Sequence, residues 1–137
     1  MFFGILLTIQ PSSAILTSPM ITQNIASPAR FSDLGIAPTL LDSLDRQKFV
    51  VPTPIQFQCI PHALQSKDIV GIAQTGTGKT LAFGIPMIQL LSQQPDAQGL
   101  VLLPTRELAL QVDQVLQQIG RSVGLRTAVI IGGASAH

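Results

Sequence analysis

The sequence predicts an α/β fold, and two patterns of apolar residues support this prediction. From Phe31 onward, short apolar runs alternate with segments in which apolar residues recur every three or four positions, as strands and helices do when they alternate. The run Leu100–Leu103 is uninterrupted, which is typical of a parallel strand covered on both faces. We therefore expect a partial parallel sheet with flanking helices.

Two helices are predicted before the first strand. The first begins near Pro38 and carries leucines at positions 40, 41 and 44 on one face. Proline suits the first turn of a helix because its missing N–H is not needed there. The second helix is expected to run from Thr53 toward Leu64, again with a proline in its first turn.

Strands and helices then alternate to the end of the chain. In order, we expect a strand over Asp68–Ala73, a helix from Lys79 to about Leu91, a strand over Leu100–Leu103, a helix with apolar residues at 108, 112, 115 and 119, and a strand over Thr127–Ile131.

Composition limits the classes of function. Hydrophobic residues make up 46% of the chain and charged residues only 11%, against roughly 25% charged in average globular proteins. This excess of apolar residues suits a piece of a larger core. The net charge is +1 and the cations are scattered, so bulk charge does not indicate nucleic-acid binding. The single Cys59 excludes a disulfide within the chain, no His or Cys cluster has metal-ligand spacing, and we expect a cytoplasmic protein.

Residues 1–29 carry no charged side chain. The apolar start Met1–Ile9 is too short to cross a bilayer, and the basic residues that begin a secretory signal are lacking. We expect residues 1–29 to be an unstructured leader or sequence upstream of the true start. Organelle targeting by this segment is the alternative.

A glycine- and threonine-rich turn between the first strand and the next helix is the strongest signal for function. It consists of Ala73, Gln74, Thr75, Gly76, Thr77, Gly78, Lys79 and Thr80. Backbone N–H groups at a helix N-terminus attract phosphate, and the glycines allow a tight turn. Lys79 would supply charge to the terminal phosphates, and the Thr80 hydroxyl would bind Mg²⁺. The general phosphate-loop pattern starts with glycine where this chain has Ala73, and the alternative is a turn that binds nothing.

The form A-Q-T-G-T-G-K-T, with alanine first, resembles motif I of the DEAD-box ATP-dependent RNA helicases. Three other segments agree in order and spacing. Phe31 with Phe49–Gln56 resembles that family's Q motif, Pro104–Ala109 its motif Ia, and Gly132-Gly133 its GG element. The resemblance covers the chain from about Phe31 to Gly133.

The chain also departs from this family's pattern. Lys48 stands where the Q motif usually has glycine, and the Asp-Glu-Ala-Asp and Ser-Ala-Thr motifs do not occur in the sequence. The resemblance therefore implies that residues 30–137 are the N-terminal portion of the first RecA-like P-loop domain of an enzyme that uses ATP to remodel RNA duplexes. It also implies that activity requires a second RecA-like domain. We expect the chain alone to be inactive, and a truncated product or a nucleotide-binding module is the alternative.

Gln56 has two interpretations. Its amide matches N6 and N7 of adenine, and Phe31 could stack on the base, as the resemblance implies. Thr53-x-x-Gln56 is also a capping box, in which the glutamine bonds the N–H at the start of its own helix. The resemblance favours adenine.

For RNA, the resemblance implies that Pro104, Thr105 and Arg106 hold a phosphate, together with exposed backbone N–H groups of Gly132 and Gly133. Such contacts do not depend on base sequence. The alternative is an ordinary helix start with Thr105 as its cap.

Overall fold

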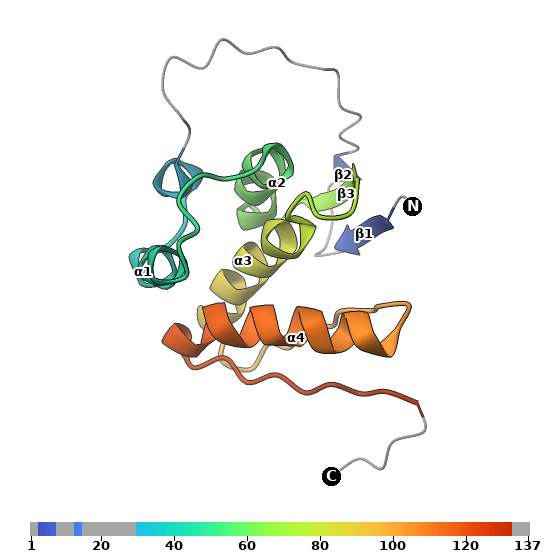
Figure 1. Cartoon of the computed structure of the whole chain (residues 1–137). Coiled ribbons are helices and arrows are strands. Elements are labelled where there is room, and N and C mark those ends of the chain that lie inside the picture. Colours follow the sequence, from blue (N-terminus) through green and yellow to red (C-terminus); the bar gives the residue numbers. More distant parts are fainter. Residues whose placement is uncertain (1–2, 8–12, 15–29, 133–137) are drawn as a thin grey trace.

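The computed structural model describes residues 3–7, 13–14 and 30–132 (Figure 1). Four α-helices, two short 3-10 helices and one strand lie within residues 30–132. In chain order these are η1 (Phe31–Leu34), α1 (Pro38–Arg46), α2 (Pro54–Leu64), β3 (Asp68–Ala73), α3 (Lys79–Ser92), α4 (Arg106–Gly120) and η2 (Arg121–Val123). Within the described residues, no helix is both long and apolar enough to cross a membrane.

The helices begin where their capping residues predict. Pro38 opens α1 and Pro54 opens α2, in each case as the first residue of the helix. The Thr105 hydroxyl accepts a hydrogen bond from the Leu108 N–H at 3.2 Å, so Thr105 is the N-cap of α4. The cap interpretation of Thr105 is therefore confirmed.

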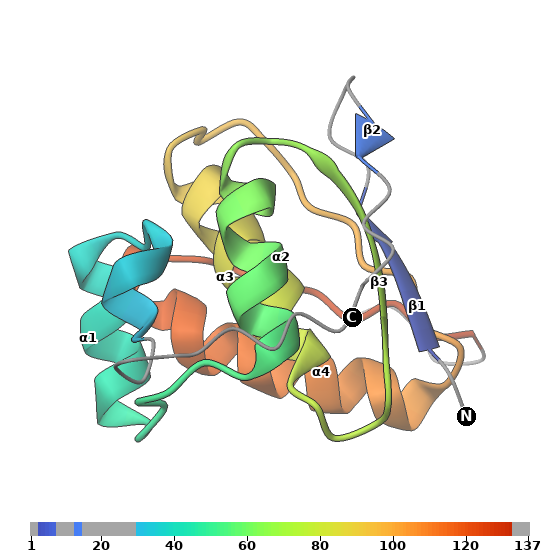
Figure 2. The same ribbon diagram turned by 90° about the horizontal axis from the view of Figure 1, so that it is seen from above.

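Helix α3 lies at the centre of the molecule, between α2 and α4 (Figure 1). Every residue of its segment Leu81–Gln89 is buried. Helix α1 packs against α4, and Figure 2 places α1 and β3 on opposite sides of the α2–α3 pair. The most deeply buried aliphatic side chains are Leu40, Leu44, Ile60, Ile85, Ile88 and Ile119. Burying each of them contributes about 1.5–3 kcal/mol.

The strands differ from the expected parallel sheet. Residues 30–132 form only β3, whereas Leu100–Leu103 and Thr127–Ile131 have no strand pairing, so both of these strand predictions are wrong for the described chain. The neighbours of β3 are β1 (Phe3–Leu7), which is antiparallel to it, and β2 (Ser13–Ala14), which is parallel. The boundary between leader and domain stays a prediction.

The two segments that fail to form strands still show strand periodicity in their exposure. Leu100 and Leu102 are exposed while Val101 and Leu103 pack against the core, and Ile130 is exposed between half-buried neighbours. A strand needs backbone partners for its N–H and C=O groups as well as an alternating pattern. These segments have the pattern, but the described residues supply no partner strand for them.

Candidate nucleotide-binding site

Residues Gln74–Gly78 form the loop that joins the end of β3 to the start of α3. Gly76 and Gly78 have φ angles of 80° and 86°, in the left-handed region that side chains with a Cβ disfavour. Gly78 is also the N-cap of α3, so its conformation turns the chain into the helix. The predicted loop is thus present between the predicted strand and helix.

Lys79 extends its ammonium group over this loop. Its Nζ donates to the carbonyl oxygens of Ala73 at 2.5 Å and Gln74 at 2.6 Å. The Thr77 hydroxyl donates to the same Gln74 carbonyl at 2.7 Å. Thr80 is half-buried in the first turn of α3. The charge predicted to meet the terminal phosphates therefore lies at the mouth of the loop, beside the N–H groups that begin the helix.

Gln56 is only 3% exposed, and both heteroatoms of its amide are hydrogen-bonded. Its Oε1 accepts from the Thr53 N–H at 2.9 Å, which confirms the capping-box interpretation. Its Nε2 donates to the Gly78 carbonyl at 3.0 Å, a contact that the sequence did not predict. A glutamine amide has two donor hydrogens and two acceptor lone pairs, so one of each remains. Adenine recognition by Gln56 stays a prediction.

The start of α2 is therefore attached directly to the phosphate loop. Besides the Gln56–Gly78 bond, the Thr53 hydroxyl donates to the Thr77 carbonyl at 2.8 Å. A Cβ added to Gly78 would clash with Nε2 of Gln56. Gly78 is consequently required both by its φ angle and by the close approach of Gln56.

The aromatic side chains divide into buried and exposed rings. Phe31, the predicted stacking residue, is 4% exposed and belongs to the main core cluster, so its ring offers almost no surface to a ligand. Phe49 is 37% exposed and lies in the loop that leads to Thr53. The sequence predicts no separate role for Phe49, although it lies in the same motif as Gln56. The stacking role of Phe31 stays a prediction, and its burial favours a packing role.

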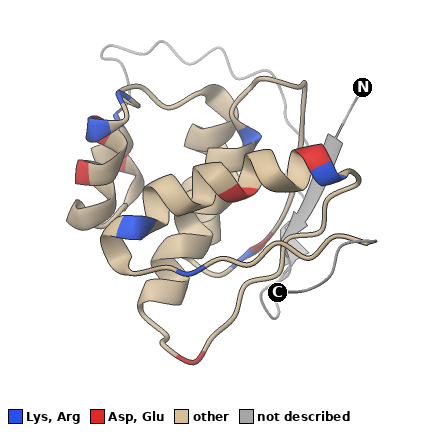
Figure 3. Cartoon of the chain, turned by 60° about the horizontal axis from the view of Figure 1, so that its bottom comes forward, with Lys and Arg blue, Asp and Glu red and all other residues tan. Residues whose placement is uncertain are grey.

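The two predicted RNA-contact segments lie together. Arg106 Nη2 donates a hydrogen bond to the Gly132 carbonyl, and Pro104, Thr105 and Arg106 are all exposed. Gly133 lies outside the described residues. Figure 3 shows basic and acidic residues interspersed over the described part of the chain, without a continuous basic face in this view. An RNA contact here would therefore depend on these particular residues.

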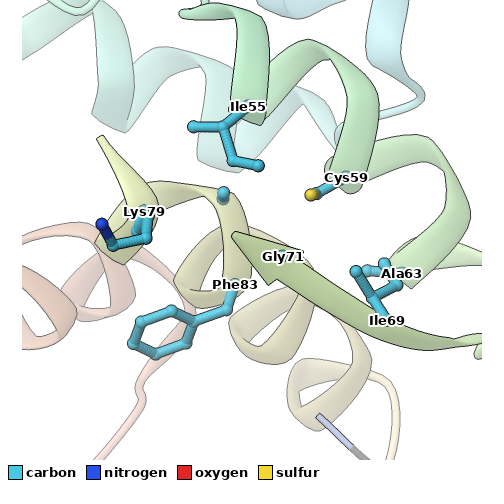
Figure 4. A pocket seen from close by; sticks show the side chains of 8 residues that line it. Ile55, Cys59, Ala63, Ile69, Gly71, Lys79 and Phe83 are labelled. Carbon is cyan, nitrogen blue, oxygen red and sulfur yellow. The ribbon is translucent and has the colours of Figure 1, made fainter. Parts of the chain in front are cut away.

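A small cavity lies between α2, β3 and α3, next to Lys79 (Figure 4). Its volume is about 30 Å³, and apolar side chains such as Ile55 and Phe83 line most of it. A cavity of this volume can hold water but is far too small for a nucleotide. The Cys59 thiol also lines it, and burial raises the pKa of this thiol, which keeps it protonated and unreactive.

Metal ligands are sparse around the loop. The described residues contain no group of three or more His, Cys, Asp or Glu side chains that could hold a metal ion. Mg²⁺ commonly takes few protein ligands and completes its shell with phosphate oxygens and water. The hydroxyl of Thr80 fits such a role.

A strand, a glycine-rich loop and a helix whose first residue is lysine define a P-loop protein. The DEAD/DEAH box helicase family model matches residues 53–137, and this chain belongs to that family. The resemblance inferred from the sequence is thereby confirmed.

Curated relatives agree with this assignment. The ATP-dependent rRNA helicase RRP3 of Debaryomyces hansenii is 52% identical over 104 residues, which cover 75% of this chain and 22% of the relative. RRP3 of Candida albicans is 53% identical over 105 residues, covering 75% of this chain and 20% of the relative. The chain thus spans about a fifth of the length of these relatives.

Solved structures support the fold. The RNA helicase Prp28 from Chaetomium thermophilum bound to ADP superposes with a TM-score of 0.71 at 36% identity, covering 77% of this chain and 27% of Prp28. Dbp5 of S. cerevisiae bound to RNA and ADP BeF3 gives a TM-score of 0.58 at 35% identity, covering 68% of this chain and 25% of Dbp5. The chain is therefore a partial RecA-like helicase domain.

Proposed function

We propose that this chain is part of an ATP-dependent RNA helicase and contributes its adenine site, its phosphate loop and part of its RNA track. The observation that carries this proposal is the attachment of the Q-motif segment to the phosphate loop, through Thr53 to Thr77 and Gln56 to Gly78. These bonds bring together two segments that the nucleotide would join, one expected to bind the base and the other the phosphates. The RRP3 relatives support the same function.

In this proposal, the phosphates lie against the N–H groups of residues 74–80 at the start of α3. The helix dipole and the Lys79 ammonium would stabilise the negative charge, because both lie at the same end of the helix. Lys79 would exchange its bonds to the Ala73 and Gln74 carbonyls for bonds to phosphate oxygens. Thr80 would hold Mg²⁺, which would supply positive charge to neutralise the phosphates.

The base would bind at the exposed end of the Q-motif segment. Gln56 is itself 3% exposed, so contact with the base would require its amide to become accessible. Its second N–H and second lone pair would then suit N7 and N6 of adenine, whereas guanine offers acceptors at both corresponding positions. We propose Phe49 as the stacking ring, since it is half-exposed, and a packing role for Phe31, which is buried.

Hydrolysis requires more than these residues. It needs an acidic group to hold Mg²⁺ and a group to orient the attacking water. Asp68 begins β3 and therefore lies at the opposite end of this strand from the loop. The family's Asp-Glu-Ala-Asp motif does not occur in the sequence, and a second RecA-like domain would also be needed. A nucleotide-binding module without turnover is therefore the second candidate function.

RNA would bind through its backbone at the start of α4. The Arg106–Gly132 contact supports this part of the proposal because it joins the two segments expected to hold phosphate. Pro104, Thr105 and the N–H groups of Gly132 and Gly133 would complete the contact. The cytoplasm remains our proposed compartment, and the unpaired Cys59 fits a reducing environment.

Nucleotide choice tests the proposal. In the full-length protein, ATP should bind in preference to GTP, and Gln56→Ala should weaken ATP binding by about 1–3 kcal/mol. Gln58→Ala is the matched control, because Gln58 is an exposed residue of the same helix. Gln56→Glu keeps an acceptor for the Thr53 N–H but lacks the amide donor, so it separates capping from recognition. Equal affinity of the wild type for ATP and GTP would contradict the adenine assignment.

A further inference from the structure

Gln89 is a buried glutamine that belongs to none of the sequence motifs. It lies in α3 and is 9% exposed. Its Oε1 accepts from the Ala37 N–H at 2.8 Å, and its Nε2 donates to the Gly35 carbonyl at 3.2 Å. The amide therefore joins the phosphate-loop helix to a turn more than 50 residues earlier in the chain.

The turn held by Gln89 lies between two helices that lack other polar anchors there. Ala37 is the N-cap of α1 and has no side chain that could cap the helix. Gly35 ends η1 with a φ of 80°. Gln89 thus satisfies the Ala37 N–H from a different helix, whereas Gln56 satisfies the equivalent N–H of α2 from within its own helix. Both bonds are partly buried, and leaving these groups unpaired would cost free energy, so Gln89 helps to hold the turn in place together with the buried side chain of Ile36.

The turn is connected through α1 to the Q-motif segment, Phe49–Gln56. Helix η1 packs against α2, and α1 packs against α4. The end of α1 leads directly into the loop that carries Phe49 and then Thr53. Any shift of the turn relative to α3 would therefore be transmitted through α1 to that loop. Because α3 begins with Lys79, the phosphate site and Gln89 lie on the same helix.

We propose that Gln89 is a positioning residue of the nucleotide site, which fixes the Q-motif segment relative to the phosphate loop by holding residues 35–37 on α3. The proposal rests on the function proposed above. Loss of the two hydrogen bonds of Gln89 should weaken nucleotide binding and leave the chemical step unchanged. Gln89 touches neither the loop nor the Q-motif segment, so its effect would pass through α1.

The test is the steady-state RNA-stimulated ATPase of the full-length protein. Gln89→Leu should raise KM for ATP about 5- to 30-fold with little change in kcat, as expected when only ground-state binding is lost. A titration with ADP should show the same fold-change in Kd. Gln89→Glu keeps the acceptor for the Ala37 N–H and should lie between wild type and Gln89→Leu, which also provides a milder variant if leucine prevents folding.

Ser92→Ala is the matched control. The Ser92 hydroxyl, in the same helix, donates to the Gln89 backbone carbonyl at 2.7 Å and leaves the Gln89 side chain and α1 unchanged. This variant should keep KM for ATP at the wild-type value. An unchanged KM in both Gln89 variants, or an equal rise of KM in Ser92→Ala, would overturn the proposal. Failure of the wild type to bind ATP would instead refute the proposed function.

Discussion

The phosphate-loop unit and the two unpaired extended segments show what the same kind of apolar pattern produces in different surroundings. Asp68–Ala73 forms β3, and α3 behind it is the most buried helix of the described chain. The sequence predicts strands equally well over Leu100–Leu103 and Thr127–Ile131, but neither segment forms one. Leu102 and Ile130 are 82% and 93% exposed. The difference lies in the available partner strands. A helix satisfies its own backbone N–H and C=O groups, whereas a strand requires a neighbouring strand to do so.

This difference also indicates how substitutions in the two regions should affect function. The loop is held by hydrogen bonds from the Q-motif segment, so its geometry is set within the described residues. The extended segment Thr127–Ile131 leads to Gly132, whose carbonyl accepts a hydrogen bond from Arg106. We therefore expect substitutions in the loop to change ATP turnover strongly, and substitutions in the extended segments to change association and solubility.

Lys79→Ala should have the largest effect. In the full-length protein, it should reduce ATP turnover on the order of 10²–10³-fold, because it removes a positive charge from the developing phosphate charge. The fold should persist, since the hydrogen bonds of the Lys79 ammonium are to loop carbonyls. Lys67→Ala, which removes a charge before β3, is the control. Normal turnover in Lys79→Ala, measured by phosphate release, would show that the loop is misassigned.

Arg106→Ala should weaken RNA binding to a similar degree for different sequences. The slope of log affinity against log salt should fall by about one unit, because one phosphate contact is lost. Arg121→Ala, at the other end of α4, removes an equal charge and serves as the control. Fluorescence anisotropy at several salt concentrations measures both quantities. A loss confined to one RNA sequence would mean that Arg106 contacts bases.

Lys48→Gly should stabilise the protein by about 0.5–1 kcal/mol. Lys48 has a φ of 63°, in the left-handed region where a side chain with a Cβ is strained and glycine is not. The family's usual glycine at this position therefore has a conformational reason. Chemical denaturation of wild type and variant gives the difference in free energy of unfolding, with the exposed and non-strained Gln58→Gly as a comparison that should destabilise. A destabilised Lys48→Gly would contradict the assignment of strain.

The paired substitution of Leu100 and Leu102 by threonine should change stability least. Exposed positions usually shift the free energy of unfolding by no more than about 0.5 kcal/mol. The same change should make the 137-residue chain more soluble, because exposed unpaired strand-like segments promote association. Light scattering measures this effect. Substitution of the half-buried Val101 and Leu103 should instead reduce stability, and equal scattering by all variants would locate the association elsewhere.

The sequence predicted local features well because their causes are local. Prolines and threonines mark the starts of α1, α2 and α4, and the glycine pattern marks the phosphate loop. Strand pairing could not be predicted in the same way, since it depends on segments distant in sequence. The role of Gln56 was predicted only in part, because its second bond goes to Gly78, on a different element.

Gln89 was overlooked for a similar reason. Its partners lie more than 50 residues away, so no local pattern indicates them. A signal was present nonetheless, because Gln89 is the only polar side chain in residues 81–91 of an otherwise apolar helix. An isolated amide in such a buried run has to find partners for its donor and acceptor groups.

The exposure of Phe49 has a practical consequence for spectroscopy. The chain contains no Trp and no Tyr, so it has almost no absorbance or emission of its own near 290 nm. A Phe49→Trp variant would place a single indole chromophore in the loop that leads to the Q motif, where a half-exposed ring already fits. Quenching of the indole fluorescence, or a blue shift of its emission, would then report occupancy of the base site without an added dye.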